Sequence, residues 1–232
     1  MIQVRTMFPI AVDSDDHKYP EGVYYDNNVN PGFVHYLEQW YQGRKIKFLD
    51  LGCAGGGLVT HLADTDHNAV GLEGSDHCLN VRPEMITEVG FLPAGYKNWE
   101  KYGNKRLFTC DITKEYDIVE DGVPMQFDLI TCWDVMEHFQ QYEVDNFLRL
   151  VHKHLSPNGF FVASIALFDA GRHAESANTP EGLNYHKSVY PREWWLERTD
   201  KYFNSVGYPF SITNRDYIID NPAYLLFTGT KK

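Results

Sequence analysis

Cysteine is scarce in this sequence, and its few cysteines form no pair with a metal-binding or redox spacing. The four are scattered without a Cys-x-x-Cys motif, and two lie in apolar runs that predict strands: Cys53, Cys78, Cys110 and Cys132. A disulfide framework and a zinc knuckle both require paired cysteines. We therefore expect reduced thiols in a cytoplasmic protein.

Long apolar runs are also missing. No stretch approaches the ~18–20 apolar residues that are needed to cross a bilayer. The first twenty residues contain no apolar run behind a basic head, which is the arrangement of a signal peptide. The sequence thus predicts neither a membrane span nor a secretory leader.

Positive charge is in deficit: Lys and Arg total 21 against 32 for Asp and Glu, a formal net charge of −11. The longest basic clusters are only Arg44–Lys47 and Lys231–Lys232. A chain this acidic repels phosphate backbones unless it carries a basic stripe. Nucleic acid is therefore a disfavoured partner, a small polar substrate is preferred, and no pattern indicates the oligomeric state.

The 232 residues are 43% hydrophobic and 15% aromatic, enough for one sizeable core and hence one domain over 1–232. Three parts are distinguished within it. Residues 1–42 hold many aromatic side chains ahead of the first expected strand and predict a helix or lid, 43–165 form the core, and 166–232 supply a loop, a helix and a hairpin.

Short apolar runs alternate with helical stripes along the core. Strands are expected at 46–51, 69–72, 106–110, 127–132 and 160–166, with helices around 58–62 and 144–155 and a turn at 156–159. Continuous apolar strands separated by helices predict a doubly wound α/β fold, a parallel sheet with helices on both faces. A helix at 191–206 should precede two β-like runs, 208–213 and 223–230, that pair as an antiparallel hairpin.

A glycine-rich loop, Asp50 to Gly57, connects the first of these strands to a helix. Glycines let the backbone turn sharply and let a ligand approach bare N–H groups at a helix N-terminus. The Gly-x-Gly-x-x-Gly pattern of a nicotinamide-dependent oxidoreductase does not fit this spacing. An acidic residue just before the loop also suits an ammonium group better than a pyrophosphate.

The loop resembles the first motif of the class I S-adenosylmethionine-dependent methyltransferases, an acidic-x-Gly-x-Gly-x-Gly run with Ala54 at the middle glycine. This resemblance implies a Rossmann-like, seven-stranded, mostly parallel sheet. It also implies that Asp50 and the loop backbone hold the methionine part of the cofactor, the loop residues being Gly52, Cys53, Ala54, Gly55 and Gly56.

Two further strand ends carry acidic residues in the order that the family uses. Glu73, followed by Gly74, ends the second strand, where a carboxylate can accept hydrogen bonds from both ribose hydroxyls. Asp111 follows the third strand and would accept from the adenine amino group, while Ile112 offers its backbone N–H. Alternatively, Glu73 is a solvated loop charge and Asp111 a turn or helix-capping residue.

The fourth strand leads into Trp133-Asp134-Val135-Met136-Glu137-His138, which resembles the quinone- and sugar-modifying O-methyltransferases. Trp133 would then flank the adenine or the thioether. Asp134, Glu137 and His138 share one face if a helix begins here. They form a capping box, or place His138 as general base, or present a metal face that a distant histidine completes.

That distant histidine is expected in the polar stretch after the fifth strand, which should border the pocket. His186 is preferred to His173 because it precedes a Val-Tyr-Pro-x-x-Trp-Trp helix start that resembles small-molecule methyltransferases of this group. Either His138 or His186 is a candidate base.

These features predict an S-adenosylmethionine-dependent methyltransferase that acts on an oxygen, less favourably a nitrogen, of a small polar substrate by in-line displacement with a histidine base. Asp134 and Glu137 would orient the base. A divalent metal is possible but not favoured, because capping alone explains Asp-x-x-Glu. The alternatives are methylation of RNA or protein, or a non-catalytic partner that keeps the cofactor fold.

Overall fold

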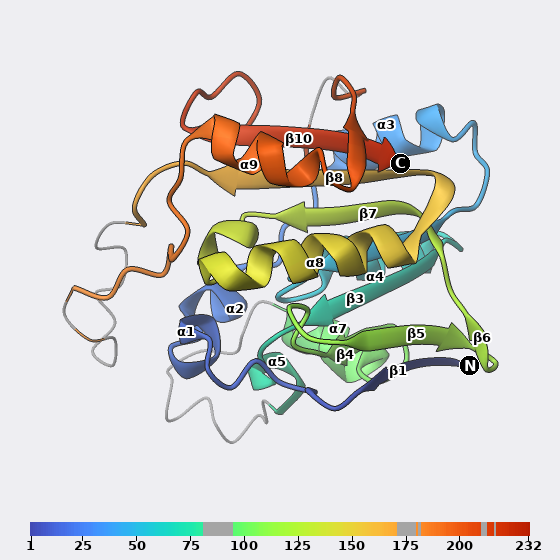
Figure 1. Cartoon of the computed structure of the whole chain (residues 1–232). Coiled ribbons are helices and arrows are strands. Elements are labelled where there is room, and N and C mark those ends of the chain that lie inside the picture. The colour runs from blue at the N-terminus through green and yellow to red at the C-terminus, as the bar shows by residue number, and fades with distance from the viewer. Residues whose placement is uncertain (81–94, 171–179, 181, 210–212, 216) are drawn as a thin grey trace.

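The computed structural model describes residues 1–80, 95–170, 180, 182–209, 213–215 and 217–232. Its centre is a seven-stranded sheet of order β4-β3-β2-β7-β8-β10-β9 (Figure 1). The strands are β2 (Lys47–Leu51), β3 (Asn68–Glu73), β4 (Leu107–Thr109), β7 (Phe127–Trp133), β8 (Leu155–Ala166), β9 (Phe203–Ser205) and β10 (Tyr224–Lys231). The first five are parallel, whereas β10 is antiparallel to β8 and to β9. The predicted fold class is confirmed.

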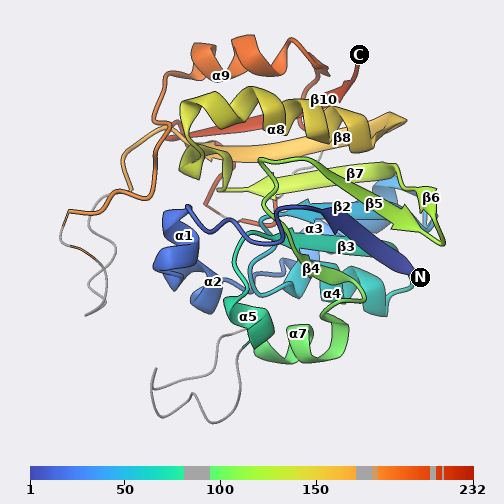
Figure 2. The same cartoon turned by 60° about the horizontal axis from the view of Figure 1, so that its bottom comes forward.

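Helices cover both faces of this sheet (Figure 2). On one face lie α8 (Gln141–His154) and α9 (Arg192–Thr199), and on the other α3 (Pro31–Trp40) and α4 (Gly57–Asp64). The α8 stripe Val144, Phe147, Leu148 and Val151 is fully buried, as its i, i+3, i+4, i+7 spacing predicts. No helix among the described residues combines the length and apolarity of a membrane crossing.

The N-terminal segment forms secondary structure of its own. It contains β1 (Ile2–Thr6), α1 (Asp15–Lys18) and α2 (Glu21–Tyr25) before α3. β1 forms an unpredicted three-stranded sheet with β5 (Tyr116–Glu120) and β6 (Val123–Pro124). Both views place α1 and α2 beyond the carboxyl ends of β7 and β8 (Figures 1 and 2). Within 1–42, these two short helices occupy the position that a lid would need, while α3 packs on the sheet.

Between β3 and β4 the described residues form two helices, α5 (His77–Asn80) and α7 (Tyr96–Tyr102), and residues 81–94 lie outside the described part. The sequence predicted a long, partly irregular insertion here. Trp99 of α7 is buried and donates its indole N–H to the carbonyl of Ala54 at 2.9 Å. This insertion therefore supports the glycine loop from outside.

Three local predictions were wrong. Residues 156–159 belong to β8, where the pairing with β7 shifts register instead of turning. The helix starts after Pro191 as expected but ends at Thr199. The first arm of the hairpin is Phe203–Ser205; of the expected arm, residues 210–212 lie outside the described part. Phe203 is fully buried against Phe161 and Phe227, whereas Pro209 has no N–H for a strand ladder.

Candidate active site

A cavity of about 290 Å³ lies at the carboxyl ends of the parallel strands. Its wall combines the glycine loop, the ends of β3, β4 and β7, and part of the N-terminal segment. Seven of the residues that the sequence nominated for the cofactor line it, namely Gly52, Ala54, Glu73, Gly74, Asp111, Ile112 and Trp133. Three separate motifs thus meet at one edge of the sheet, as parallel strands require.

The first half of the glycine loop faces this cavity. Gly52 has a φ of +75°, and a Cβ there would come within 2.4 Å of Cγ2 of Val135. Ala54, which replaces the middle glycine, has a φ of +43°. Side chains adopt this left-handed backbone only at a cost of about 1 kcal/mol or more. The loop therefore keeps the glycine-type conformation at the one position where the sequence departs from the motif.

The second half of the loop faces protein instead. The Gly55 N–H donates to the carbonyl of Asp26 at 2.9 Å, and a Cβ on Gly56 would meet Leu107 at 2.6 Å. The Cys53 thiol points at Gly71 of β3, where a Cβ would come within 2.7 Å of its sulfur. These positions dock the loop onto its neighbours.

Asp50 lies beneath the cavity wall. It is buried and accepts a hydrogen bond from the Thr131 hydroxyl at 2.6 Å. Burial raises the pKa of Asp50 to about 7, against the opposing effect of the Thr131 bond. Asp50 is absent from the residues that line the cavity, and its contact with an ammonium group stays a prediction.

Glu73 fastens the end of β3 to the glycine loop. One carboxylate oxygen accepts from the Ala54 N–H at 2.8 Å and the other from the Ser75 N–H at 3.0 Å. Burial raises the pKa of Glu73 to about 7, although both backbone bonds lower it. The interpretation of Glu73 as a solvated loop charge is wrong, because the side chain is buried and lines the cavity.

Asp111 and Trp133 complete this side of the cavity. Asp111 Oδ1 accepts from the Thr113 N–H at 3.0 Å and from its hydroxyl at 2.6 Å, which confirms the turn interpretation. The second oxygen, Oδ2, takes no part in either bond. Trp133 is buried, and its ring meets Phe33 edge to face at 5.6 Å. Both residues line the cavity.

Asp134 does not cap a helix, which was one of its predicted roles. Its φ of +55° turns the chain before a short 3₁₀ helix, η2 (Met136–His138), whose N-cap is Val135 with no side-chain cap. Asp134 instead accepts from the hydroxyls of Ser164 and Tyr217, both at 2.5 Å. The capping box was therefore wrong here. A real one follows at Gln140 and Glu143, at the start of α8.

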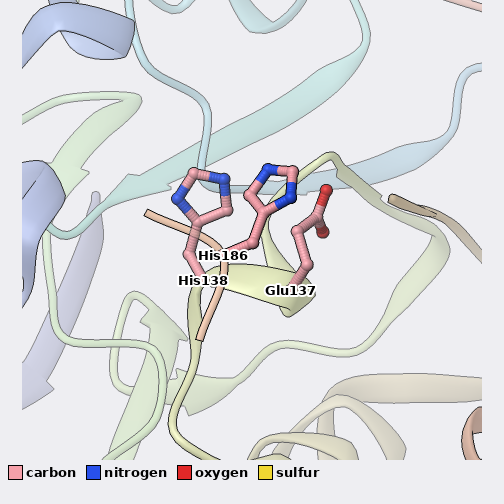
Figure 3. Close-up of side chains that lie close together, drawn as sticks. All are labelled: Glu137, His138 and His186. Carbon is pink, nitrogen blue, oxygen red and sulfur yellow. The ribbon is translucent and has the colours of Figure 1, made fainter. Parts of the chain in front are cut away.

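Glu137, His138 and His186 form the second cluster of predicted residues (Figure 3). One ligand atom from each lies within 4.8 Å of the others. One atom of each side chain is fixed by a hydrogen bond. Glu137 Oε1 accepts from the Ala166 N–H at 3.0 Å, and His186 Nδ1 donates to the Phe168 carbonyl at 2.6 Å. His138 Nδ1 donates to Asp16 at 2.9 Å. The less favoured histidine candidate, His173, lies outside the described residues.

The three side chains of this cluster differ in the direction in which their pKa values are shifted. Burial alone would lower the pKa of His138, but the Asp16 carboxylate outweighs it and raises that pKa to about 9. Burial raises the pKa of Glu137 to about 8, partly offset by His138. Burial lowers the pKa of His186. His138 is therefore cationic at neutral pH, and His186 is a neutral imidazole whose Nδ1 carries the proton.

Sequence analysis missed the partners from the N-terminal segment. Three of its carboxylates, here called the N-terminal carboxylates, reach across the cavity edge: Asp15 pairs with Lys187 at 2.5 Å, Asp16 with His138, and Asp26 with Arg215. The acidic run Asp13-Ser14-Asp15-Asp16 was the only available signal. It does not disclose which distant cation each carboxylate meets.

Comparisons with known proteins agree with this geometry. A sequence profile described as "Methyltransferase domain" matches residues 25–208. The chain is 30% identical over 126 residues to a small RNA 2′-O-methyltransferase of Gallus gallus, and 28% over 110 residues to a ubiquinone biosynthesis O-methyltransferase of Methylococcus capsulatus. These matches cover 54% and 47% of this chain but only 32% and 40% of the two relatives, so the chain spans less than half of either.

Solved structures show the same fold. A TehB-like SAM-dependent methyltransferase from Corynebacterium glutamicum superposes with a TM-score of 0.52 at 19% identity, covering 88% of this chain and 89% of that one. An S-adenosylmethionine-dependent methyltransferase from Clostridium acetobutylicum gives 0.52 at 15%, covering 86% and 90%. Because the family profile matches well over half of the sequence, the chain belongs to the methyltransferase-domain family of S-adenosylmethionine-dependent enzymes.

Proposed function

We propose that this protein methylates a hydroxyl oxygen of a small polar substrate, with His186 as the general base. The observation that carries the proposal is the hydrogen bond from His186 Nδ1 to the Phe168 carbonyl. A carbonyl can only accept, so Nδ1 keeps the proton and Nε2 keeps a lone pair. His186 lies 5.0 Å, ring centre to ring centre, from His138, which lines the cavity.

Residues of the opposite wall would hold the cofactor. Glu73 would accept from the ribose hydroxyls, and Asp111 Oδ2, which the Thr113 bonds leave unused, would accept from the adenine amino group. The Gly52 and Ala54 backbone would cradle the amino-acid part, Ile112 would offer its N–H, and Trp133 would flank the adenine or thioether. S-adenosylmethionine supplies a methyl group that its sulfonium already activates. What remains for the chain is to align the acceptor and remove its proton.

The two histidines have different tasks in this proposal. His138 donates Nδ1–H to Asp16 and is cationic at neutral pH, so it is a hydrogen-bond donor rather than a base. His186 is neutral and has Nε2 available. The structure thereby favours His186 in a choice that the sequence left open.

The charge of the cavity favours a small neutral acceptor over nucleic acid. Eight carboxyl side chains line it, against two lysines, Lys114 and Lys187. Both lysines are already paired, with Glu143 and Asp15 respectively. A phosphodiester in such a cavity would meet more repulsion than attraction.

A second candidate adds a divalent cation to the same reaction. Glu137 Oε2 is buried, and none of the described residues donates to it. Together with Nε2 of His186, and with Nε2 of His138 once that ring has given up its second proton, it would make a carboxylate-and-imidazole site whose outer atoms are already fixed by Ala166, Asp16 and Phe168. A cation there would lower the pKa of a bound hydroxyl.

The test measures methyl transfer from tritium-labelled S-adenosylmethionine to a catechol, a phenol, a free sugar and a single-stranded RNA oligonucleotide. We expect label in a small hydroxyl compound, and a loss of kcat by ~10²–10⁴ in His186→Ala with unchanged S-adenosylhomocysteine affinity. Label in the RNA alone would refute the substrate class.

Two controls separate the candidates. His35→Ala changes an exposed histidine of α3 and should leave the rate unchanged. Treatment with EDTA should have no effect on a metal-free enzyme, whereas loss of activity that Mg²⁺ or Mn²⁺ restores would establish the cation version. Full activity of His186→Ala in both conditions would remove His186 from either mechanism.

A further inference from the structure

One part of the cavity wall is built by a short stretch of the N-terminal segment. Five consecutive residues, Asp13 to His17, line the cavity, and they include most of helix α1. Lys187, from the chain after β8, lines the cavity as well. The wall is therefore closed here by the meeting of α1 with the chain around Lys187.

Helix α1 contributes nothing to the apolar core. Its sequence is Asp-Asp-His-Lys, and none of its four residues is buried. The chain is anchored on either side of it: the Ala11 N–H donates to the carbonyl of Gly74 at 2.8 Å, and Val23 of α2 is buried in the core. Elements with few buried apolar contacts open locally at a low cost in free energy. The stretch between these two anchors is therefore the part of the wall best suited to move.

Two polar contacts join this stretch to the chain around Lys187. The Asp15 carboxylate pairs with the Lys187 ammonium at 2.5 Å, and both side chains are partly buried. The Tyr185 hydroxyl donates to the carbonyl of Tyr19 at 3.0 Å. The Lys187 backbone is itself held in place, because its N–H donates to the carbonyl of Glu137 at 2.8 Å. A movable stretch thus meets a fixed one across the cavity wall.

We propose that the Asp15–Lys187 pair is the latch of an entry gate, and that α1 moves away from Lys187 to admit a ligand to the cavity and returns behind it. The contact between Tyr185 and Tyr19 is the second part of this latch. Closure of such an element holds the ligand and excludes water. The gate concerns access to the cavity, so it does not depend on which atom of the acceptor is methylated.

A rival account makes the ion pair a static contact that only keeps α1 in place. The two accounts predict different kinetics. Loss of a static contact disorders the wall, so a ligand binds more weakly and associates no faster. Loss of a latch lowers the barrier to opening in both directions, so association and dissociation both accelerate and the affinity changes little.

Stopped-flow fluorescence on the full chain measures both rate constants with S-adenosylhomocysteine, because Trp133 is buried at the cavity wall and reports its occupation. Both constants should rise about threefold to tenfold in Asp15→Asn and in Lys187→Met, as loss of one partly buried ion pair implies. Kd should stay within about twofold of wild type. The double variant should be no faster than either single variant, because both substitutions remove the same contact.

Lys114→Met is the matched control. Lys114 also lines the cavity, and its ammonium also pairs with a carboxylate, that of Glu143 at 2.7 Å, but neither residue belongs to the N-terminal segment. This variant removes the same charge from the cavity without touching the gate, and both rate constants should change by less than about twofold.

Wild-type rate constants in both Asp15→Asn and Lys187→Met, or a loss of affinity without faster association, would overturn the gate. An equal acceleration in Lys114→Met would trace the effect to charge and overturn it too. Wild-type protein that does not bind S-adenosylhomocysteine would instead count against the cofactor itself, a failure of a different kind.

Discussion

The two walls of the cavity are built by different means. The cofactor wall is held together by hydrogen bonds of backbone groups. The Glu73 side chain accepts from the Ala54 and Ser75 N–H groups, and the Gly52 N–H donates to the carbonyl of Leu72 at 2.8 Å. The acceptor wall is made of side-chain pairs between the N-terminal carboxylates and cations that lie more than a hundred residues away.

This difference has an energetic consequence. Backbone conformations that only glycine adopts freely cannot be repaired by a side-chain movement. Partly exposed ion pairs are weaker and depend on protonation. We therefore expect the cofactor wall to be disrupted by substitutions that add atoms to its glycines. We expect the acceptor wall to be weakened by a change of pH that alters the charges of its ion pairs.

The largest effect is expected from Gly52→Ala in the cofactor wall. The new Cβ would lie 2.4 Å from Val135 Cγ2 at a φ of +75°. Left-handed strain and overpacking together should cost about 3–5 kcal/mol of unfolding free energy. Urea denaturation measures this cost, and calorimetry should show cofactor affinity falling with it.

Gly122→Ala is the matched control, because Gly122 has a φ of +82° and no atom within 4 Å of its ideal Cβ. It should cost only about 1 kcal/mol. Equal costs for both variants would mean that Val135 moves aside and that the loop is not rigid.

The cofactor wall could be predicted from the sequence because its determinants are local. Each strand end carries its candidate cofactor residue within the same short motif, and a parallel sheet places these ends together. Glu73, Asp111 and Trp133 all lie where that rule puts them. The sequence also assigned Gly55 and Gly56 to the cofactor, because it could not show that these two glycines face other parts of the protein.

The acceptor wall could not be predicted, since its contacts have no sequence period. Asp134 looked like a helix cap because Glu137 follows three residues later, but its positive φ sends the carboxylate to Ser164 and Tyr217. The Asp16 to His138 pair joins residues 122 apart. Proximity of this kind follows only from the packed fold.

A smaller effect is expected from pH on the acceptor wall. The pKa of His138 is about 9 in the folded protein and ~6.5 when unfolded, so the folded state binds the extra proton in between. Its stabilisation is fully present below pH ~6.5 and is lost as pH rises through about 9, an effect on the order of 2 kcal/mol because the pair is partly exposed.

Asp16→Asn should flatten this alkaline decline when unfolding free energy is measured from pH 6 to 9.5 in EDTA. Glu137 also favours the lower pH and interacts with His138, so Glu137→Gln is introduced into both proteins and their difference then reports the ion pair. Asp145→Asn removes an exposed pair with Lys201 and should leave the slope unchanged. A slope that survives Asp16→Asn would show that Asp16 does not hold the proton on His138.

The smallest effect should come from Glu73→Gln, which keeps the size of the side chain but can no longer offer two carboxylate oxygens. Part of its hydrogen bonding to the Ala54 and Ser75 N–H groups survives in the amide oxygen, so the loop should hold. We expect S-adenosylhomocysteine to bind about tenfold more weakly, about 1.4 kcal/mol, through lost bonds to the ribose diol. The 2′-deoxyribose analogue of the ligand provides the check: wild type should bind it more weakly than the parent, and the variant should discriminate less. A variant that weakens both ligands by the same factor would assign Glu73 to loop support alone, and the ribose contact would have to be sought elsewhere on the cofactor wall.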